Sequence, residues 1–122
     1  MTKLDKFSPL EKFEGIEEYW SPKIAAEFNG QQMRLAKLKG EFVWHSHEHE
    51  DEVFFVLDGE LKIELRDRTI NLKSGEVFVV PRGVEHRPVA ESEVRVMLIE
   101  PAETVNTGAT QSEWTQKNIG WV

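Results

Sequence analysis

The chain has 122 residues, a length typical of one domain with a substantial buried core. It contains no cysteine, which excludes disulfides, thiolate nucleophiles and cysteine-based zinc or iron–sulfur sites, and which is compatible with a reducing cytoplasm. Its formal net charge is −7, from 15 basic and 22 acidic residues, without a run of lysine or arginine. We therefore expect no nucleic-acid partner, because such binding depends on clustered positive charge.

Neither a secretory signal nor a membrane span is predicted. Residues 1–30 lack a positively charged start followed by an apolar core, and no apolar stretch approaches the roughly 20 residues that cross a bilayer. We expect a cytoplasmic protein without a membrane partner.

The N-terminal region predicts one short helix. In the run Ser8-Pro9-Leu10-Glu11, Ser8 is a favourable N-cap, Pro9 suits the first helical position and Glu11 can close a capping box.

From Lys23 onward, short apolar runs alternate with turn residues at a spacing typical of an all-β sandwich or barrel. The turn signals are Asn29-Gly30, Lys39-Gly40, Asp58-Gly59, Asp67-Arg68, Ser74-Gly75 and Arg82-Gly83. Asn29-Gly30 and Asp58-Gly59 tolerate the positive φ angles of two-residue hairpin turns. Each therefore predicts that its two flanking strands pair antiparallel.

The strands differ in how many faces they bury. Leu61, Ile63 and Leu65 alternate with charged residues, which predicts one buried face, and Ile70 with Leu72 continues that face. Segments 53–57 and 77–80 are apolar on both faces, so each needs the barrel interior on one side and a second layer on the other. We expect a partner subunit to supply that layer, which predicts a homodimer.

All four histidines lie in two short stretches, and this clustering indicates a metal site because histidine is the commonest metal ligand. If 45–49 is a β-strand, His45, His47 and His49 share one face about 6.6 Å apart, with Phe42 and Trp44 on the opposite face. Two adjacent imidazoles can then hold one ion. Glu52 can add an oxygen ligand where the chain turns back, and His86 can close the set from a distant strand.

Two motifs carry a family resemblance. Gly40-x4-His45-x-His47-x4-Glu52-x6-Gly59 followed by Gly75-x5-Pro81-x-Gly83-x2-His86 resembles the signature motifs of the cupin superfamily, here in a short single-domain form of the cupin 2 type. The first motif usually begins one residue further from its first histidine, and the second usually ends in Asn where this chain has Ala90. Neither departure removes a ligand.

The resemblance implies a fold and a cofactor. The fold is an antiparallel double-stranded β-helix, the jelly-roll or cupin barrel, with one domain over 1–122: an N-terminal extension (1–22), a barrel (about 23–101) and a C-terminal tail (102–122). The cofactor is one divalent transition metal ion per chain, manganese, iron, nickel, copper or zinc, bound by His45, His47, Glu52 and His86. Pro81 and Gly83 are expected to fix the bend that aims His86 inward.

Several residues near this site have two interpretations. His49 can replace His45 in an alternative register, or lie exposed, and Asp51 can accept a hydrogen bond from a ligand imidazole, or lie in an acidic solvated loop. A substrate pocket or the core explains Phe54, Val56, Leu65 and Phe78 equally well. An anionic substrate would be bound by arginine, and the candidates, otherwise surface residues, are Arg66, Arg68, Arg82, Arg87 and Arg95.

The ligand set leaves three functions open. Iron, copper, nickel or manganese suits a dioxygenase acting on enediols or flavonoid-like diols, which is the function we favour. Zinc or manganese suits an aldose–ketose isomerase, similar to mannose-6-phosphate isomerase, or a lyase. The third function is a binding or sensing module for a small molecule, without turnover. A metal-free cupin similar to sugar epimerases is a further reading, against which the complete ligand set argues.

Overall fold

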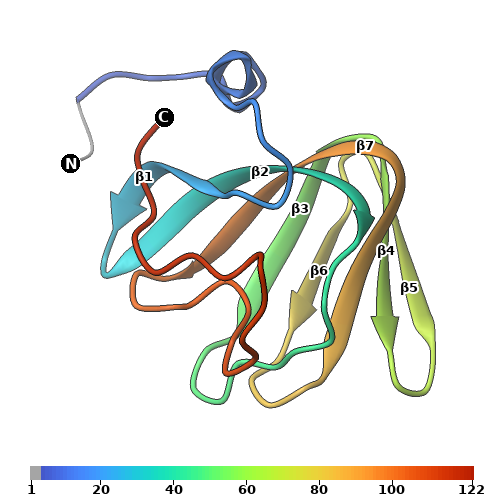
Figure 1. The fold of residues 1–122 in the computed structure, drawn as a ribbon. Coiled ribbons are helices and arrows are strands. Elements are labelled where there is room, and N and C mark those ends of the chain that lie inside the picture. The colour runs from blue at the N-terminus through green and yellow to red at the C-terminus, as the bar shows by residue number, and fades with distance from the viewer. Residues whose placement is uncertain (1–3) are drawn as a thin grey trace.

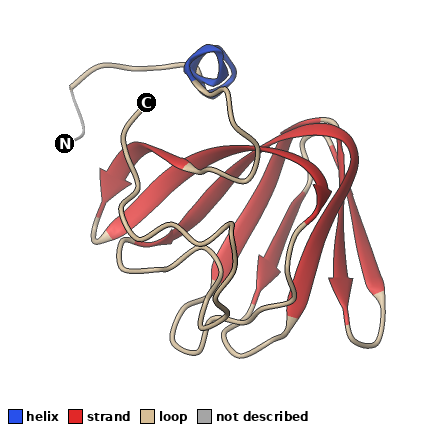
Figure 2. Ribbon diagram, viewed as in Figure 1, coloured by secondary structure: helices blue, strands red, loops and turns tan. Residues whose placement is uncertain are grey.

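The structure is a computed structural model that describes residues 4–122. A short helix α1 (Pro9–Lys12) and a 3-10 turn η1 (Phe13–Gly15) precede seven strands (Figures 1 and 2). The strands are β1 (Lys23–Phe28), β2 (Gln31–Glu41), β3 (Glu52–Asp58), β4 (Glu60–Leu65), β5 (Thr69–Lys73), β6 (Val77–Val80) and β7 (His86–Pro101). The predicted all-β fold with one short N-terminal helix is confirmed, whereas the single-domain organisation stays a prediction.

The N-terminal helix forms as its sequence predicts. Ser8 is the N-cap, with its hydroxyl accepting a hydrogen bond from the Glu11 backbone N–H at 3.4 Å, and Pro9 opens the first turn. Because α1 has only four residues, its position depends on packing rather than on its own propensity. That packing comes from η1, where Phe13 lies buried against Leu35 of β2.

The 16-residue strand β7 closes the barrel. Its first half, from His86, pairs with β4, and its second half, up to Pro101, pairs with β3, while β2 runs along its other edge. All these pairings are antiparallel. Register shifts in β2 and β3 act as bulges, which bend a sheet and increase its twist. One strand therefore serves both sides of the barrel, as Figure 1 shows.

One predicted hairpin is confirmed and the other is wrong. Asn29 and Gly30 have φ angles of 48° and 76° and join the antiparallel pair β1–β2. The strands beside Asp58-Gly59, β3 and β4, do not pair with each other, because both pair with β7. Gly59 is required there for a different reason: its φ is 102°, and a Cβ would stand 2.9 Å from the Glu93 carbonyl oxygen of β7.

The barrel interior forms the main hydrophobic core. The predicted inward residues Leu61, Ile63 and Leu72 are buried there, with Leu65 and Ile70 packed against them. Phe54 and Val56 face the same core from β3, whereas Val53 and Phe55, which alternate with them, are only partly buried. The N-terminal turn covers one part of this outer face, at Leu57 and Met97.

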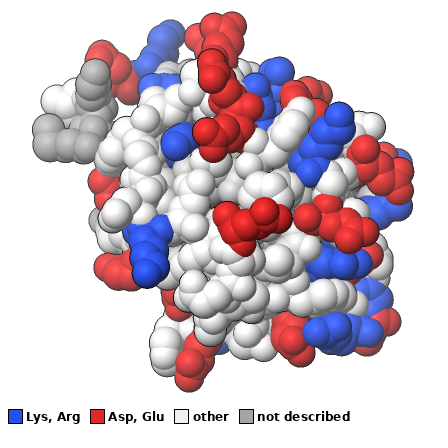
Figure 3. All heavy atoms as spheres, in the orientation of Figure 1, with Lys and Arg blue, Asp and Glu red and all other residues white. Residues whose placement is uncertain are grey.

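The C-terminal segment wraps back over the barrel (Figure 1). Trp114 packs against the main core, while Trp121 is bridged to Ile24 and remains partly exposed. Acidic and basic side chains are interspersed on the face drawn in Figure 3. Among the described residues, no helix has the length and apolar character needed to cross a bilayer.

Candidate metal centre

Four ligand-type side chains meet inside the barrel. His45, His47, Glu52 and His86 are all buried, and one nitrogen or carboxylate oxygen from each lies within 4.8 Å of the others. Two of them come from the connection between β2 and β3, one from the start of β3 and one from the start of β7. The structure thus brings together the four residues that the sequence motifs predicted as ligands.

Backbone contacts bring the two motifs together. His45 and His86 form an antiparallel bridge in which each backbone N–H donates to the carbonyl of the other, at 3.0 and 2.9 Å. The Gly83 N–H donates to the His47 carbonyl at 2.8 Å from the turn after Pro81. Gly83 has a φ of 79°, which suits glycine, so the predicted bend at this turn is present.

Segment 45–49 is not a β-strand, so the condition under which His45, His47 and His49 would share one face is not met. The segment between β2 and β3 is irregular apart from the His45–His86 bridge, so strict alternation does not apply. As a consequence Phe42 does not lie on the opposite side from His45: their rings make an edge contact with centroids 5.3 Å apart. Trp44 does lie elsewhere, under the Arg66 guanidinium at 3.8 Å.

The imidazole rings of His45 and His86 are oriented by main-chain carbonyls. His45 Nδ1 lies 2.9 Å from the Val43 oxygen, and His86 Nδ1 lies 2.9 Å from the Val84 oxygen. Because a carbonyl only accepts, each Nδ1 carries the proton, and in the neutral ring the lone pair is at Nε2. Metal-binding histidines are commonly held in this way.

Polar atoms without partners identify the centre of the cluster. Among the described residues, His47 Nδ1, His47 Nε2, Glu52 Oε1 and His86 Nε2 are buried without a hydrogen bond of acceptable geometry. His47 Nε2 and His86 Nε2 lie 3.5 and 3.4 Å from Glu52 Oε1. Burying such atoms unsatisfied is costly. A divalent transition metal would satisfy Glu52 Oε1, His86 Nε2 and one of the two nitrogens of His47, so the residues present fit such an ion.

The electrostatics favour the ligand protonation states. Burial, with the nearby His86, lowers the pKa of His45 to about 4, so its ring is neutral at pH 7. Burial alone would raise the pKa of Glu52, but a hydrogen bond with Glu100 and contacts with His47 and His86 hold it well below its ordinary value. A neutral imidazole and an ionised carboxylate are the forms that bind a metal ion.

A buried Arg34–Glu100 pair lies behind Glu52, and the sequence interpretation missed it. Glu100 Oε1 accepts from Arg34 Nη1 at 2.7 Å, and a protonated Glu100 can hydrogen-bond to the neighbouring Glu52. Burial and the Glu52 charge raise the pKa of Glu100 well above its ordinary value, which favours a neutral acid. The alternation of side chains along β7 could have revealed the buried position of Glu100, since Glu100 shares a face with the apolar residues Val96 and Leu98.

The structure places the two alternative site residues outside the cluster. His49 is exposed and its Nε2 lies 3.8 Å from a Glu48 oxygen. Asp51 accepts a hydrogen bond from the Arg82 backbone N–H at 2.8 Å, and no bond from a ligand imidazole to it is present among the described residues. The hydrogen-bond acceptors of the His45 and His86 rings are the Val43 and Val84 carbonyl oxygens, not the Asp51 carboxylate that the sequence analysis considered.

Only one of the four predicted pocket residues lines the cavity beside the metal cluster. Phe54 does so, together with His45 and Glu52. Val56, Leu65 and Phe78 pack in the main core and do not line this cavity. Phe42, Trp20 and Asn106 line this cavity and were missed as site residues, since they come from segments outside regular strands.

The five candidate arginines pair with carboxylates away from this cavity. Their partners are Glu85 for Arg66, Asp67 for Arg68, Asp51 for Arg82, Glu41 and Glu64 for Arg87, and Glu93 for Arg95. The five arginines are therefore better interpreted as surface residues than as residues that bind a substrate at this site.

Comparison with known proteins agrees with the geometry. The profile of the family described as Cupin domain (Cupin_2) matches residues 32–100, which include all four clustered ligands. The protein YdbB of Bacillus subtilis (strain 168) is 43% identical over 63 residues, covering 51% of this chain and 56% of YdbB. The match thus spans little more than half the length of this curated relative.

Two solved structures are similar over most of the chain. A cupin-2 domain containing protein from Shewanella frigidimarina NCIMB 400 has 47% identity and a TM-score of 0.77, covering 78% of this chain and 93% of that one. Protein NMB1881 from Neisseria meningitidis has 33% identity and a TM-score of 0.73, covering 80% and 100%. With the matched profile and the barrel that holds its two motifs together, this chain belongs to the cupin domain family.

Proposed function

We propose that this cupin is a metal-dependent enzyme acting on a small oxygenated molecule, with dioxygenase-like chemistry. The observation that carries the proposal is the group of buried, unsatisfied ligand atoms beside a cavity that His45 and Glu52 help to line. His45, His47, His86 and Glu52 would hold one manganese, iron, nickel, copper or zinc ion. An ion that accepts six ligands would keep two positions for substrate or for substrate and dioxygen.

The side chains around the site position and isolate it. The Val43 and Val84 carbonyls fix two ligand rings, and the hydrogen bond from Glu100 fixes the Glu52 carboxylate. The cavity wall is mostly apolar, and electrostatic interactions are stronger beside such a wall than in bulk water. When bound, the metal ion supplies polarisation of a substrate oxygen and, for a redox-active metal, reactivity toward dioxygen.

The cavity lining favours a dioxygenase over the alternative, a sugar isomerase or lyase. Isomerisation through an enediolate needs a group that moves a proton to and from carbon. The titratable residues that line this cavity are His45 and Glu52, and the proposed role of both is metal ligation. The second alternative, a binding or sensing module without turnover, shares the metal centre and differs only in lacking product formation.

Metal analysis tests the centre itself. We expect untagged wild-type protein to contain one divalent metal ion per chain and His47→Ala to lose most of it, because the variant lacks one of the four clustered ligand atoms. His49→Ala is the matched control, since that ring is exposed and should leave the metal content unchanged. Equal metal content in wild type and His47→Ala would contradict the proposed site.

Activity measurements with and without oxygen separate the three functions. A dioxygenase loses turnover when oxygen is removed, an isomerase or lyase keeps it, and a binding module shows ligand-dependent stabilisation without product. We expect oxygen-dependent turnover of a small oxygenated substrate by protein loaded with iron, copper, nickel or manganese. Turnover that persists without oxygen would support the isomerase or lyase instead.

We also propose that the protein is a homodimer formed through the outer face of β3, β6 and β7. On this face Val53 pairs with Ile99 and Val79, and Phe55 pairs with Val77, while Met97 beside Phe55 is covered by the N-terminal turn. Val77 and Val79 are 49% and 47% exposed, and a contiguous apolar face of this kind favours association. Light scattering should give twice the chain mass, and a monomer at micromolar concentration would overturn the proposal.

A cytoplasmic location stays a prediction from the cysteine-free sequence, which cell fractionation would test.

A further inference from the structure

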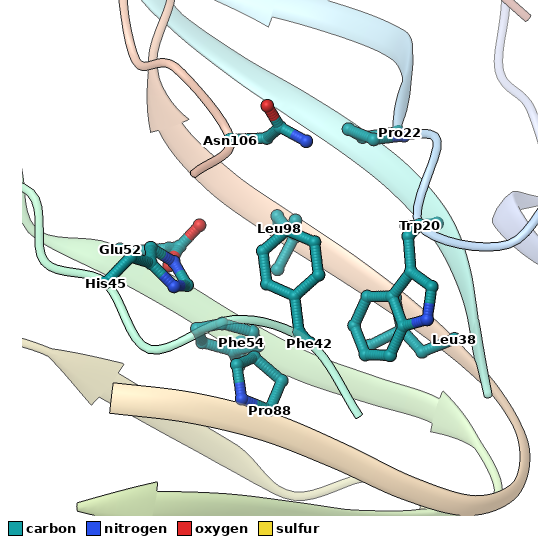
Figure 4. Close-up of a pocket in the computed structure, with 11 residues that line it drawn as sticks. Trp20, Pro22, Leu38, Phe42, His45, Glu52, Phe54, Pro88, Leu98 and Asn106 are labelled. Carbon is teal, nitrogen blue, oxygen red and sulfur yellow. The ribbon is translucent and has the colours of Figure 1, made fainter. Parts of the chain in front are cut away.

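A small cavity lies beside the metal cluster, and its composition constrains what can bind there. Figure 4 shows His45 and Glu52 at one side, Trp20 at the other and Phe42 between them. The volume is about 40 Å³, and apart from His45, Glu52 and Asn106 the lining side chains are apolar. The main ones are Trp20, Leu38, Phe42, Phe54, Pro88 and Leu98.

The remaining polar side chain of the lining is already engaged. Asn106 Nδ2 donates to the Trp114 carbonyl at 2.7 Å, and its Oδ1 accepts from the Gln116 N–H at 2.9 Å. A ligand with many hydroxyl groups would therefore leave most of them without partners, and this strongly disfavours binding in an apolar site.

Among residues 4–122, which the structure describes, no positive side chain lines this cavity to meet an anion. Arg34 is buried nearby, behind Glu52, but its guanidinium donates to Glu100 Oε1 at 2.7 Å, Gln32 Oε1 at 2.9 Å and the carbonyls of Thr104 and Ala102. Five further arginines pair with surface carboxylates, as described above. A phosphate or carboxylate tail would thus be buried without a counter-charge.

Trp20 is held against this cavity in an unusual backbone conformation. Its φ is 59°, a left-handed value that is costly for a bulky side chain and often marks functional positions. Its backbone N–H donates to the Lys37 carbonyl and its Nε1 to the Lys39 carbonyl, each at 2.9 Å. The polar groups of Trp20 are thereby satisfied, and its ring stacks on Phe42 with centroids 4.7 Å apart.

The volume sets the size of the ligand group. An engineered cavity of about 150 Å³ holds one benzene molecule. The present cavity, at about 40 Å³, fits a hydrocarbon group of only a few carbon atoms.

We propose that the substrate is a small uncharged molecule in which two neighbouring oxygen atoms bind the metal ion and a short hydrocarbon group packs against Trp20, Phe42 and Phe54. This proposal rests on the metal centre of the proposed function. It assigns Trp20 as a specificity-determining residue and places phosphorylated and polyhydroxylated sugars outside the substrate range.

Alkyl hydroxamates test the substrate class, because each binds a metal through the same two oxygens while the tail changes. Calorimetry on zinc-loaded protein compares acetohydroxamate, butyrohydroxamate, benzohydroxamate and the hydroxamate of succinate, which has a carboxylate tail. Affinity should rise about fourfold per methylene from acetohydroxamate to butyrohydroxamate. The carboxylate-tailed probe should bind at least about tenfold more weakly than butyrohydroxamate, and benzohydroxamate should also bind more weakly.

Variants locate the effect at Trp20. Trp20→Leu should abolish most of the gain from the longer tail and leave acetohydroxamate binding within about twofold. Trp121→Leu is the control, since Trp121 does not line this cavity and is partly exposed. If Trp20→Leu does not fold, the probe series with wild-type protein decides by itself.

The outcomes distinguish this inference from the proposed function. Zinc that fails to bind would refute the metal centre. Zinc-loaded protein that binds all tails equally, or prefers the carboxylate or the benzene ring, would keep the metal centre and overturn the substrate class.

Discussion

The buried Glu100 allows a sharp test of how the carboxylate ligand is supported. Glu100 accepts a hydrogen bond from Arg34 through Oε1 and hydrogen-bonds to Glu52. Because its pKa is raised by burial and by Glu52, we expect a neutral acid that donates its proton to the Glu52 carboxylate. A glutamine has the same shape, with an oxygen for Arg34 and an N–H₂ for Glu52. Glu100→Gln should therefore change the free energy of unfolding by less than about 1 kcal/mol.

Glu100→Ala should be far more harmful. It leaves the Arg34 guanidinium, which is 1% exposed, without its carboxyl partner and removes the support of Glu52. Leaving a buried charged group without one of its hydrogen-bond partners costs about 1–3 kcal/mol or more. Since Arg34 keeps three other acceptors, we expect about 3 kcal/mol, which lowers the urea midpoint by roughly 1.5–2 M if the m value is about 1.5–2 kcal/mol/M.

The assay is urea unfolding of metal-free protein at pH 7, followed by tryptophan fluorescence, with zinc affinity measured by chelator competition. Glu100→Ala should weaken zinc binding by about 10- to 100-fold, as expected for loss of a residue that orients a ligand. Glu103→Ala is the control, because that neighbouring side chain is exposed. If Glu100→Gln destabilises the protein as much as Glu100→Ala does, Glu100 is ionised and the reasoning is refuted.

Two further predictions concern pH and backbone packing. The pKa of His45, lowered to about 4 by burial and by His86, should appear as an NMR titration midpoint near that value in metal-free protein, and a midpoint near 6.5 would contradict the burial argument. Since the folded pKa is depressed, stability is full above pH 6.5 and should fall by at most about 3 kcal/mol toward pH 4. The raised pKa of Glu100 acts with the opposite sign, losing stability as pH rises above 4.5, so the measurement is made in Glu100→Gln. Gly108→Ala should destabilise by at least about 2 kcal/mol, because its Cβ would overlap the Ser46 carbonyl oxygen and its φ is 59°. Gly120→Ala, which has open space around its Cβ, is the control for thermal unfolding, and equal melting temperatures would contradict this packing.

Local signals predicted the elements whose structure depends on neighbouring residues. Ser8-Pro9 begins a helix and Asn29-Gly30 closes a hairpin because capping and positive φ angles are properties of a few adjacent residues. Asp58-Gly59 has the same local preference but a different outcome. Whether its flanking strands pair depends on β7, whose first residue, His86, lies 27 positions after Gly59.

The site likewise has features that the local sequence predicted and features that depend on distant residues. Motif spacing selected His45, His47, Glu52 and His86, because ligands of one ion need fixed residue types at fixed separations. Sequence alternation failed for Phe42, since alternation holds only inside a regular strand and 42–51 is not one. Glu100 lies on an inward position of β7, yet its partner Arg34 is 66 residues away along the chain.

The sequence by itself thus determined the family, the four candidate ligands and the strand faces that are buried. The tertiary structure alone decided that His49 and Asp51 lie outside the cluster, that Arg34 and Glu100 support Glu52 from behind, and that Trp20 and Phe42 line the cavity beside the ligands. The physical reason is range. The ligand motifs and the periodicity of strands can be recognised from residues that are close in the sequence. The polarity and volume of a cavity depend on side chains that only the closed barrel brings together.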